Sequence, residues 1–226
     1  GGEPRNVPAM EQTSLKLTPL HTRYSFAGAG VEIDLAFFTP AFLDDMDLLS
    51  RPVTYLTWTA HSTDGAQHDV SVFLGASPEI AVSMTGQQVV FSRNHTASTS
   101  VLSVGTRDQA VLNRSGDDLR IDWGYFHIAV PNNETAKTAI SEHPDRDFAG
   151  DGTLPAADTM DGPVAANRRA PQLAVVLPLG SVGSAPVSKH VLVSYTQDYS
   201  IQMFQQNLRP YWQRNNKPVA TMLDET

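Results

Sequence analysis

The residue types best suited to chemistry gather between positions 117 and 125. Asp117, Asp118 and Asp122 supply carboxylates, and Trp123 and Tyr125 supply aromatic rings beside them. Carboxylates next to aromatic platforms are used both by enzymes that hydrolyse sugars and by proteins that bind them. A structural role explains the same pattern, because a tryptophan on a strand is usually a core residue and aspartates after a glycine are common in turns. We therefore predict a binding site at Asp122, Trp123 and Tyr125, with a core role as the alternative.

A second polar cluster, which we call the acidic connector, lies between two apolar segments. Asp44, Asp45 and Asp47 fall within four positions, and Arg51 follows them. Calcium takes several oxygen ligands, and clustered carboxylates can supply these. A solvated loop that caps a turn explains the cluster as well, with Arg51 paired to one of the carboxylates. Arg51 is also a candidate binding residue.

The segment DRDFAGDG at 145–152 superficially resembles a calcium-binding loop. Its candidate ligands are Asp145, Asp147 and Asp151. The EF-hand pattern requires Asp or Asn at the fifth position and Glu at the twelfth. Ala149 and Ala156 occupy those positions here. The loop thus predicts a calcium site that departs from the EF-hand pattern, and we expect no other cofactor.

Composition and missing motifs exclude several other functions. The chain has no cysteine, which excludes disulfides, thiolate zinc sites and cysteine nucleophiles. Its seven histidines show no HxH or HExxH spacing, and no GxSxG motif is present. A net charge of −8 argues against nucleic-acid binding. No run of about 18 apolar residues exists that could span a bilayer.

Alternating apolar residues predict that short antiparallel strands carry these side chains. Residues 31–40, 53–60 and 68–75 show the period of two that is typical of half-buried strands. Asp64 and Gly65 predict a tight turn, so we expect 53–60 and 68–75 to form a β-hairpin. Further strands are expected near 15–17, 21–25, 79–84, 88–93, 101–104 and 172–180, and another within 184–204, where Val191 and Val193 share one face and Leu192 the other. This spacing predicts an all-β chain folded as an antiparallel β-sandwich that buries Ile33, Phe37, Leu56 and Val72 against each other.

The remaining segments predict how the chain is divided. We expect a lead-in at 1–14, the sandwich at 15–208 and, at 209–226, a linker toward a helical domain that follows. Residues 132–171 are rich in Asp, Gly and Pro and predict a long irregular insertion with a short helix near 134–143. The apolar alternation changes phase at Gly124, which predicts a β-bulge there.

Longer strings of the sequence resemble a known family. The segments DDMDLLSRPVTYLTWTAHSTDGAQHDVSVFLGAS and LRIDWGYFHIAVP resemble the amino-terminal region of the glutaminase A family, large secreted proteins of bacteria and fungi. LTPLHTRYSFAGAGVEIDLAFFTPAFL resembles the same region in register. The resemblance runs in order through residues 18–130 and returns at SYTQDYSIQMF and LRPYWQRN, but it does not extend through 132–171.

The resemblance implies a fold and a function. The fold would be a supersandwich-like β-sandwich, similar to the N-terminal domains of helical-toroid glycosidases, in front of a C-terminal helical domain of the same polypeptide. Family members hydrolyse L-glutamine to L-glutamate and ammonia, and the resemblance implies an extracellular or periplasmic location. Because no family motif places catalytic residues on this chain, it implies a non-catalytic module that shapes the cleft of the helical domain, with glutamine or a glycan at the interface.

A carbohydrate-binding or glycosidase-associated sandwich is the alternative function. It is based on Asp122, Trp123 and Tyr125 and on architectural analogy, which concerns the fold and not the site.

Overall fold

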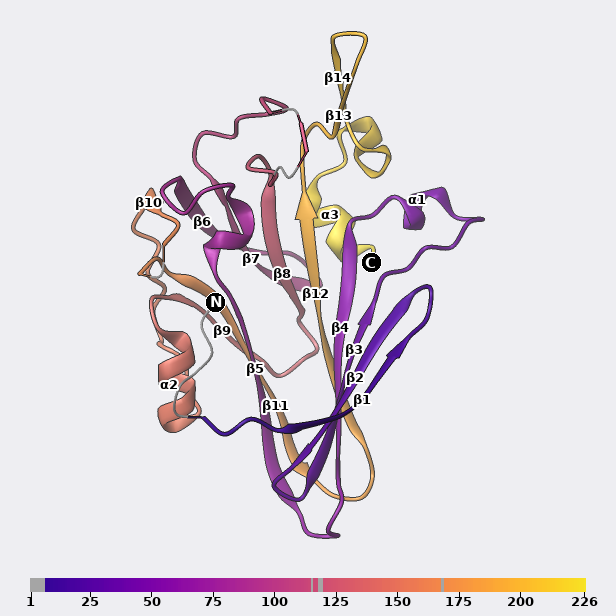
Figure 1. The fold of residues 1–226 in the computed structure, drawn as a ribbon, viewed down its shortest axis with the longest axis vertical. Coiled ribbons are helices and arrows are strands. Elements are labelled where there is room, and N and C mark those ends of the chain that lie inside the picture. The colour runs from indigo at the N-terminus through magenta and orange to yellow at the C-terminus, as the bar shows by residue number, and fades with distance from the viewer. Residues whose placement is uncertain (1–6, 115, 118–119, 168) are drawn as a thin grey trace.

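Two sheets of unequal size form an antiparallel β-sandwich in this computed structural model, which describes residues 7–226 apart from 115, 118–119 and 168 (Figure 1). The strands are β1 (Glu11–Leu17), β2 (His21–Gly28), β3 (Val31–Phe38), β4 (Val53–Ser62), β5 (His68–Ala76), β6 (Gln88–His95), β7 (Thr99–Thr106), β8 (Tyr125–Pro131), β9 (Lys137–Ser141), β10 (Val164–Ala165), β11 (Gln172–Val182), β12 (Val187–Thr196), β13 (Ile201–Met203) and β14 (Gln206–Leu208). The helical segments are α1 (Met46–Leu49), η1 (Pro78–Ala81), α2 (Pro144–Asp151), η2 (Tyr211–Asn216) and α3 (Val219–Asp224).

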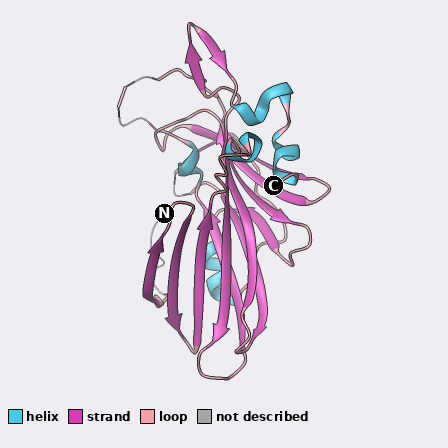
Figure 2. Ribbon diagram, turned by 90° about the vertical axis from the view of Figure 1, so that its right-hand side faces the viewer, coloured by secondary structure: helices cyan, strands magenta, loops and turns pink. Residues whose placement is uncertain are grey.

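The large sheet has the order β1-β2-β3-β4-β12-β8-β7-β6-β10, and the small sheet has the order β5-β11-β9. Strands β13 and β14 form a separate hairpin at the top of the molecule (Figures 1 and 2). The predicted fold class is therefore confirmed.

The main core lies between the two sheets. Leu56 and Trp58 of β4 pack with Leu173, Val175 and Leu177 of β11 in one cluster. The apolar residues predicted to pack together, Ile33, Phe37, Leu56 and Val72, all belong to this cluster. Burying such branched and aromatic side chains contributes about 1.5–3 kcal/mol each.

The outer face of the large sheet carries a second, smaller core. Val53 and Leu192 point outward and are covered by Trp212 of η2 and by Met222 and Leu223 of α3. The sequence predicted that residues 209–226 form a linker. In the structure η2 and α3 pack against the sheet, so this segment is part of the folded body, and whether a helical domain follows stays a prediction.

The predicted hairpin of residues 53–60 and 68–75 is wrong. Strand β4 pairs with β3 and β12 in the large sheet, whereas β5 pairs with β11 in the small one. A turn with Gly65 at φ +78° does connect them, but it leads from one sheet to the other. Alternation specifies which side chains face the core and is equally satisfied in either sheet, so it does not identify the neighbouring strand.

Two further predictions, a strand at 79–84 and a β-bulge at Gly124, are wrong. In both segments the observed backbone differs from the one that apolar alternation predicts. Residues 79–84 begin with the 3-10 helix η1, whose cap is the Ser77 hydroxyl, instead of a strand. The phase change at Gly124 is no bulge, because β8 starts only at Tyr125 and Gly124 has φ +105° in the turn before it.

The segment 132–171 is more regular than predicted. Its expected helix near 134–143 is the strand β9, which pairs with β11, and the helix α2 starts only at Pro144. Strand β10 pairs with β6 at the edge of the large sheet. Arg93 of β6 holds Asp158 through two hydrogen bonds of 2.6 and 2.7 Å, which ties the segment to the sandwich. Of the described helices, none has the length and apolar character needed to cross a membrane.

Candidate functional site

Trp123 belongs to the interior and is not an exposed platform. Its side chain is 7% exposed, and its indole Nε1 donates a hydrogen bond to the carbonyl oxygen of Tyr199 at 3.1 Å. The hydroxyl of Tyr195 donates to the Trp123 carbonyl oxygen at 3.1 Å. The structural alternative therefore holds for this residue, because a ring that is almost fully buried offers no open face on which a sugar could stack.

Asp122 is buried beside Trp123 and is held by two partners. It is 1% exposed, and its Oδ2 accepts a hydrogen bond from Gln87 Nε2 at 2.8 Å and lies 2.9 Å from Arg114 Nη2. Burial, together with the Asp122 carboxylate, raises the pKa of Tyr195 to about 12, so that phenol stays a neutral donor. Of the three predicted binding residues, Asp122 and Trp123 are therefore in the interior, and Tyr125 is at the surface. Of the other two aspartates, Asp117 is exposed and Asp118 is outside the described residues.

Tyr125 lines a small cavity of about 140 Å³ between β8, β12 and η2. The ring of His127 lies in the same wall, where Nδ1 is 2.7 Å from Ser103 Oγ and Nε2 is 2.8 Å from Thr196 Oγ1. Burial lowers the pKa of His127 to about 4, so the ring is neutral at pH 7. Sequence reasoning missed this residue, since only the register of three neighbouring strands brings its partners to it.

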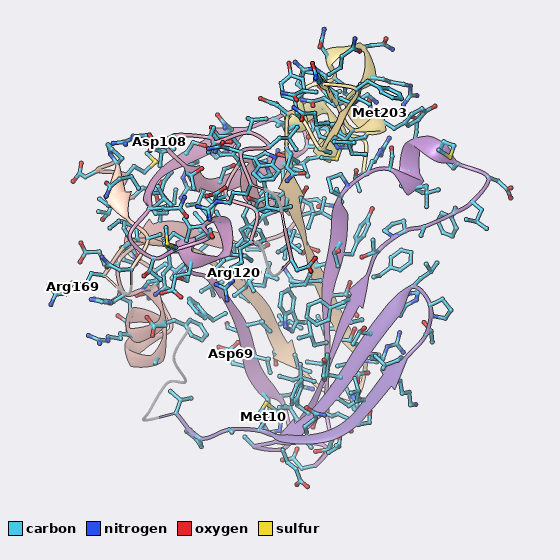
Figure 3. The ribbon with its side chains drawn as sticks, turned by 45° about the horizontal axis from the view of Figure 1, so that its top comes forward. Met10, Asp69, Asp108, Arg120, Arg169 and Met203 are labelled. Carbon is cyan, nitrogen blue, oxygen red and sulfur yellow. The ribbon has the colours of Figure 1, made fainter. Side chains whose placement is uncertain are left out.

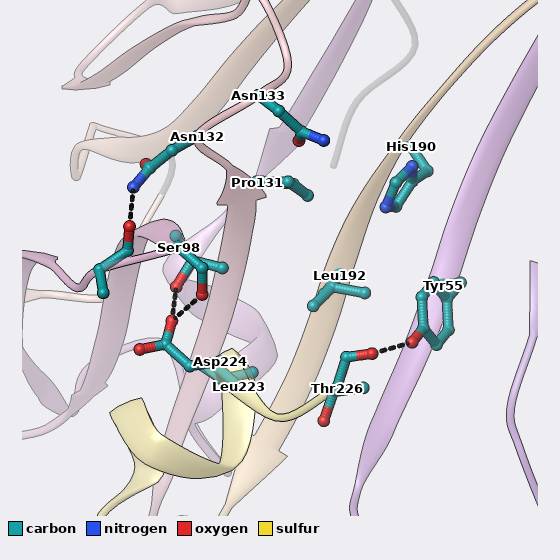
Figure 4. Close-up of a pocket in the computed structure, with 12 residues that line it drawn as sticks. Tyr55, Ser98, Pro131, Asn132, Asn133, His190, Leu192, Leu223, Asp224 and Thr226 are labelled. Carbon is teal, nitrogen blue, oxygen red and sulfur yellow. Dashed lines mark hydrogen bonds between the residues drawn. The ribbon is translucent and has the colours of Figure 1, made fainter.

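A larger groove of about 450 Å³ opens on the outer face of the large sheet, beside the C-terminal residues (Figure 4). Tyr55, Leu192 and His190 line its floor, while Asn133 and Asp224 lie on its walls. Hydrogen bonds from Ser98 and Thr96 lower the pKa of Asp224, so this carboxylate is ionised and fixed. The groove therefore offers ring edges and fixed polar groups together.

An aromatic row runs across four strands from this groove. His21 stacks on Phe38 at a centroid distance of 4.4 Å, Phe38 lies 5.9 Å from Tyr55, and Tyr55 lies 6.0 Å from His190. The first pair is nearly parallel, so these two rings turn their faces toward each other. Such cross-strand contacts stabilise a sheet.

Arg51 holds the C-terminal segment in place. Its Nη2 lies 3.0 Å from Glu225 Oε2, and its Nη1 donates to the Glu225 carbonyl oxygen at 2.8 Å. The sequence predicted that Arg51 pairs with a carboxylate of the acidic connector, and this is wrong. In that connector Asp45 caps α1 by accepting from Leu48 N at 2.9 Å, and Asp47 forms an ion pair with Arg214 of η2.

The candidate calcium ligands lie on α2 and not in a loop. Asp145 and Asp147 are in its first turn, and Asp151 at its end accepts hydrogen bonds from the amide and hydroxyl of Thr153 at 3.0 and 2.6 Å. Within the part of the chain that the structure describes, no three acidic or histidine side chains gather so that they could hold a metal ion. A calcium loop of the predicted kind is therefore not formed by these three residues.

One end of the molecule exposes an apolar surface, which we call the apolar end. It comprises the β13–β14 hairpin, η2, α1 and the loop before α1, and the ion pair between Asp47 and Arg214 joins α1 to η2 (Figures 1 and 3). Phe204 at the tip of the hairpin is 88% exposed and Leu43 in the loop is 83% exposed. The other members are Phe42, Met46, Ile201, Met203, Leu208 and Tyr211. Large apolar side chains exposed on neighbouring elements are typical of an interaction surface.

The family model described as "Domain of unknown function (DUF5127)" matches residues 20–226. The chain belongs to the DUF5127 family. The match includes η2 and α3, in agreement with their packing on the sheet. The family description names no activity, so the resemblance to glutaminase A stays a prediction.

Solved structures give only distant matches to this DUF5127 domain. A protein described as a kojibiose phosphorylase from the human microbiome matches 77% of the chain, with 7% identity and a TM-score of 0.39. Heparan sulfate lyase HepC from Pedobacter heparinus matches 86%, with the same identity and TM-score. The DUF5127 chain spans 17% and 23% of these two proteins. No curated protein matches it. At this level of similarity we infer no function from these structures.

Proposed function

We propose that this DUF5127 chain is a non-catalytic β-sandwich module that packs against a helical domain of the same, larger polypeptide. The observation that carries the proposal is the apolar end. A two-stranded hairpin on its own is at best marginally stable in water, and every residue of β13 and β14 is exposed. A partner that covers Ile201, Met203 and Phe204 would stabilise it.

The backbone at the tip supports a binding role. Phe204 and Gln205 have φ values of +48° and +63°, a region that Asn and Gly occupy at low cost in tight hairpins. An aromatic residue there is unfavourable for the isolated hairpin. Such local strain is typical of residues retained for contacts with a partner.

The finer proposal concerns the parent protein, meaning the full-length protein that contains these residues. The sequence resemblance supports an exported glutaminase A-like protein that hydrolyses L-glutamine to L-glutamate and ammonia. In that protein the module would shape the cleft of the helical domain and contribute no catalytic group.

Hydrogen exchange and an amidase assay test the proposal together. In the parent protein we expect the amides of residues 201–208 to exchange at least about tenfold more slowly than in residues 1–226 alone. The variant Phe204→Asn suits the turn better, so it should leave the module folded while weakening this protection. Leu17→Ser, which changes an exposed residue on β1, is the matched control and should have no effect on the hairpin.

Two outcomes would contradict the proposal. Equal exchange of residues 201–208 in the two proteins would show that the hairpin has no partner domain. Ammonia release from L-glutamine by residues 1–226 alone would show that the module carries its own catalytic site.

Carbohydrate binding is the second candidate function, and the outer groove supports it. Tyr55 and His190 provide rings there, and Asn133 and Asp224 provide groups that can hydrogen-bond sugar hydroxyls. Affinity electrophoresis in soluble glucan and xylan tests this function. Retardation that is lost in Asn133→Ala and kept in Tyr125→Ala would place the sugar in the groove. Unretarded migration in both polysaccharides would count against this candidate.

A further inference from the structure

The small cavity beside His127 contains hydrogen-bonding groups that no described residue satisfies. It lies where β8 begins and β12 ends, near the top of the molecule, and η2 forms one of its sides (Figure 1). Buried polar atoms in folded proteins almost always have a hydrogen-bond partner, so an atom without one needs an explanation. Two such atoms, Gln213 Oε1 and Gln197 Nε2, belong to residues that line this cavity.

The orientation of the Gln213 amide follows from its other contact. The residue is 7% exposed, and its Nε2 donates to Asp198 Oδ1 at 3.3 Å. Because the nitrogen is used in this way, Oε1 is left as a buried acceptor. Gln197 leaves the opposite group, since its buried Nε2 has no acceptor among the described residues. The cavity therefore offers one free acceptor and one free donor.

The neighbouring polar side chains are paired with one another. Gln109 Nε2 donates to the Gly124 carbonyl oxygen at 3.1 Å, and Gln109 Oε1 accepts from the Gly124 amide at 2.6 Å. Gln109 does so with a φ of +41°, which costs free energy in any residue but glycine and is typical of functional sites. Both ring nitrogens of His127 are hydrogen-bonded to hydroxyls. Binding a ligand therefore falls to the two glutamines and to the ring of Tyr125.

The volume of the cavity limits the ligand. It is about 140 Å³, and cavities of about 150 Å³ in other proteins hold one benzene molecule, so about six non-hydrogen atoms fit. A whole sugar with all its hydroxyls is larger than that. Tyr125 is 37% exposed and Asp198 is exposed too, so the cavity opens to solvent beside these residues. A larger ligand can therefore enter with one edge first.

The free groups favour a neutral ligand, because a charge without a partner is costly to bury. An anion would have to pass the Asp198 carboxylate, whose ion pair with Arg209 is long at 4.0 Å. A cation would satisfy Gln213 Oε1 but would leave Gln197 Nε2 without an acceptor. A hydroxyl both donates and accepts, so two neighbouring hydroxyls satisfy both glutamines. The carbon atoms between them can pack on the apolar body of Tyr125.

We propose that this cavity binds one sugar residue edge-on, through a vicinal diol. One hydroxyl would donate to Gln213 Oε1, its neighbour would accept from Gln197 Nε2, and the carbons that carry them would lie against Tyr125. The rest of the sugar would stay at the mouth of the cavity. This site is separate from the outer groove, and the proposal stands whether or not the groove binds a polysaccharide.

The test is an NMR titration of ¹⁵N-labelled residues 1–226 with methyl α-D-glucopyranoside and methyl α-D-mannopyranoside, whose diols at C2 and C3 differ in geometry. We expect at least one of them to shift the side-chain amide signals of Gln197 and Gln213 with a Kd below about 10 mM. Tetrahydropyran-2-methanol has the same ring without a vicinal diol and should cause no saturable shift. Acetamide also donates and accepts, but it should bind more weakly because it offers less apolar surface to Tyr125.

Two variants locate the sugar. Gln213→Leu keeps the bulk of the side chain but removes its acceptor, so it should weaken the affinity by about tenfold. Tyr125→Ala, at a partly exposed ring, should stay folded and weaken the affinity by a similar factor. Gln12→Leu, at an exposed residue on β1, is the matched control and should leave the affinity unchanged.

Four outcomes would overturn the proposal. The first is the absence of a saturable shift with either glycoside, which would leave water as the occupant of the cavity. The second and third are equal binding of tetrahydropyran-2-methanol and tighter binding of acetamide. The fourth is a shift at Asn133 and His190 instead, which would place the sugar in the outer groove. None of these outcomes depends on whether the apolar end binds a helical domain.

Discussion

Lowering the pH should destabilise the fold through His127. Its ring is 7% exposed, and both nitrogens are within 2.8 Å of hydroxyl oxygens, those of Ser103 and Thr196. A neutral imidazole can donate at one nitrogen and accept at the other, so these contacts suit the neutral form. Protonation would place a charge in this interior with no carboxylate in direct contact among the described residues.

The size and sign of the effect follow from the pKa. Burial lowers the pKa of His127 from 6.5 to about 4 in the folded protein. The unfolded chain therefore takes up a proton first as the pH falls below 6.5, which favours unfolding. The destabilisation grows down to pH 4 and is then constant. A gap of about two and a half pKa units, at about 1.4 kcal/mol each, corresponds to about 3 kcal/mol.

Urea unfolding at several pH values between 7.5 and 4.5, followed by tryptophan fluorescence, measures this effect. His127→Gln keeps an amide that can donate and accept but cannot titrate. We expect the wild type to lose about 2.5 kcal/mol more than the variant over this range. Aspartates titrate in both proteins, so their contribution cancels in the difference. Parallel curves for the two proteins would refute the assignment of a neutral, buried His127. His95→Gln, at an exposed ring, should behave as the wild type.

Three other substitutions, two of them paired with a control variant, test the structural roles described above by urea unfolding. Trp123→Ala should lower the free energy of unfolding by about 3–5 kcal/mol, because its ring is buried. Tyr125→Ala, at a partly exposed ring, should lower it by less than about 1 kcal/mol, and equal losses would contradict the core role of Trp123. Arg51→Ala should lower the free energy of unfolding by about 1–2 kcal/mol, because it releases the C-terminal segment from Glu225. The control Arg107→Ala breaks only an exposed ion pair with Asp108 and should change it by less than about 0.5 kcal/mol. Gly124→Ala should cost about 2 kcal/mol or more, since its new Cβ would lie 2.3 Å from the Thr196 carbonyl oxygen. A neutral result would contradict the close approach of Gly124 to the end of β12.

The sequence predicted the strands whose burial is strongly periodic. The segment 184–204 shows this around β12, because Val191 and Val193 pack in the main core while Leu192 belongs to the outer cluster, as alternation requires. The run at 172–180 is continuously apolar, which is typical of a strand buried on both faces, and it forms β11 at the centre of the small sheet. These predictions succeed because each depends on side-chain direction along one strand.

The candidate site was less predictable. The types of Asp122 and Trp123 suggested an exposed binding surface, but both are covered by residues far along the chain, such as Gln87 and Tyr199. Arg51 was correctly expected to bind a carboxylate, yet its partner is Glu225 and not one of the nearby aspartates. Residue type indicates what a side chain can bind, whereas its partner depends on which distant segment packs beside it.

By itself the sequence determined that this chain is an acidic, cysteine-free, antiparallel sandwich with a core made by alternating apolar residues. Only the tertiary structure decided which strands share a sheet, that β4 and β5 are in different sheets, and that the last residues fold back onto the outer face. The physical reason is the range of the interactions involved. Alternation and turn propensity act between residues close in the chain, whereas strand order and partner choice depend on the best joint burial of all the segments together.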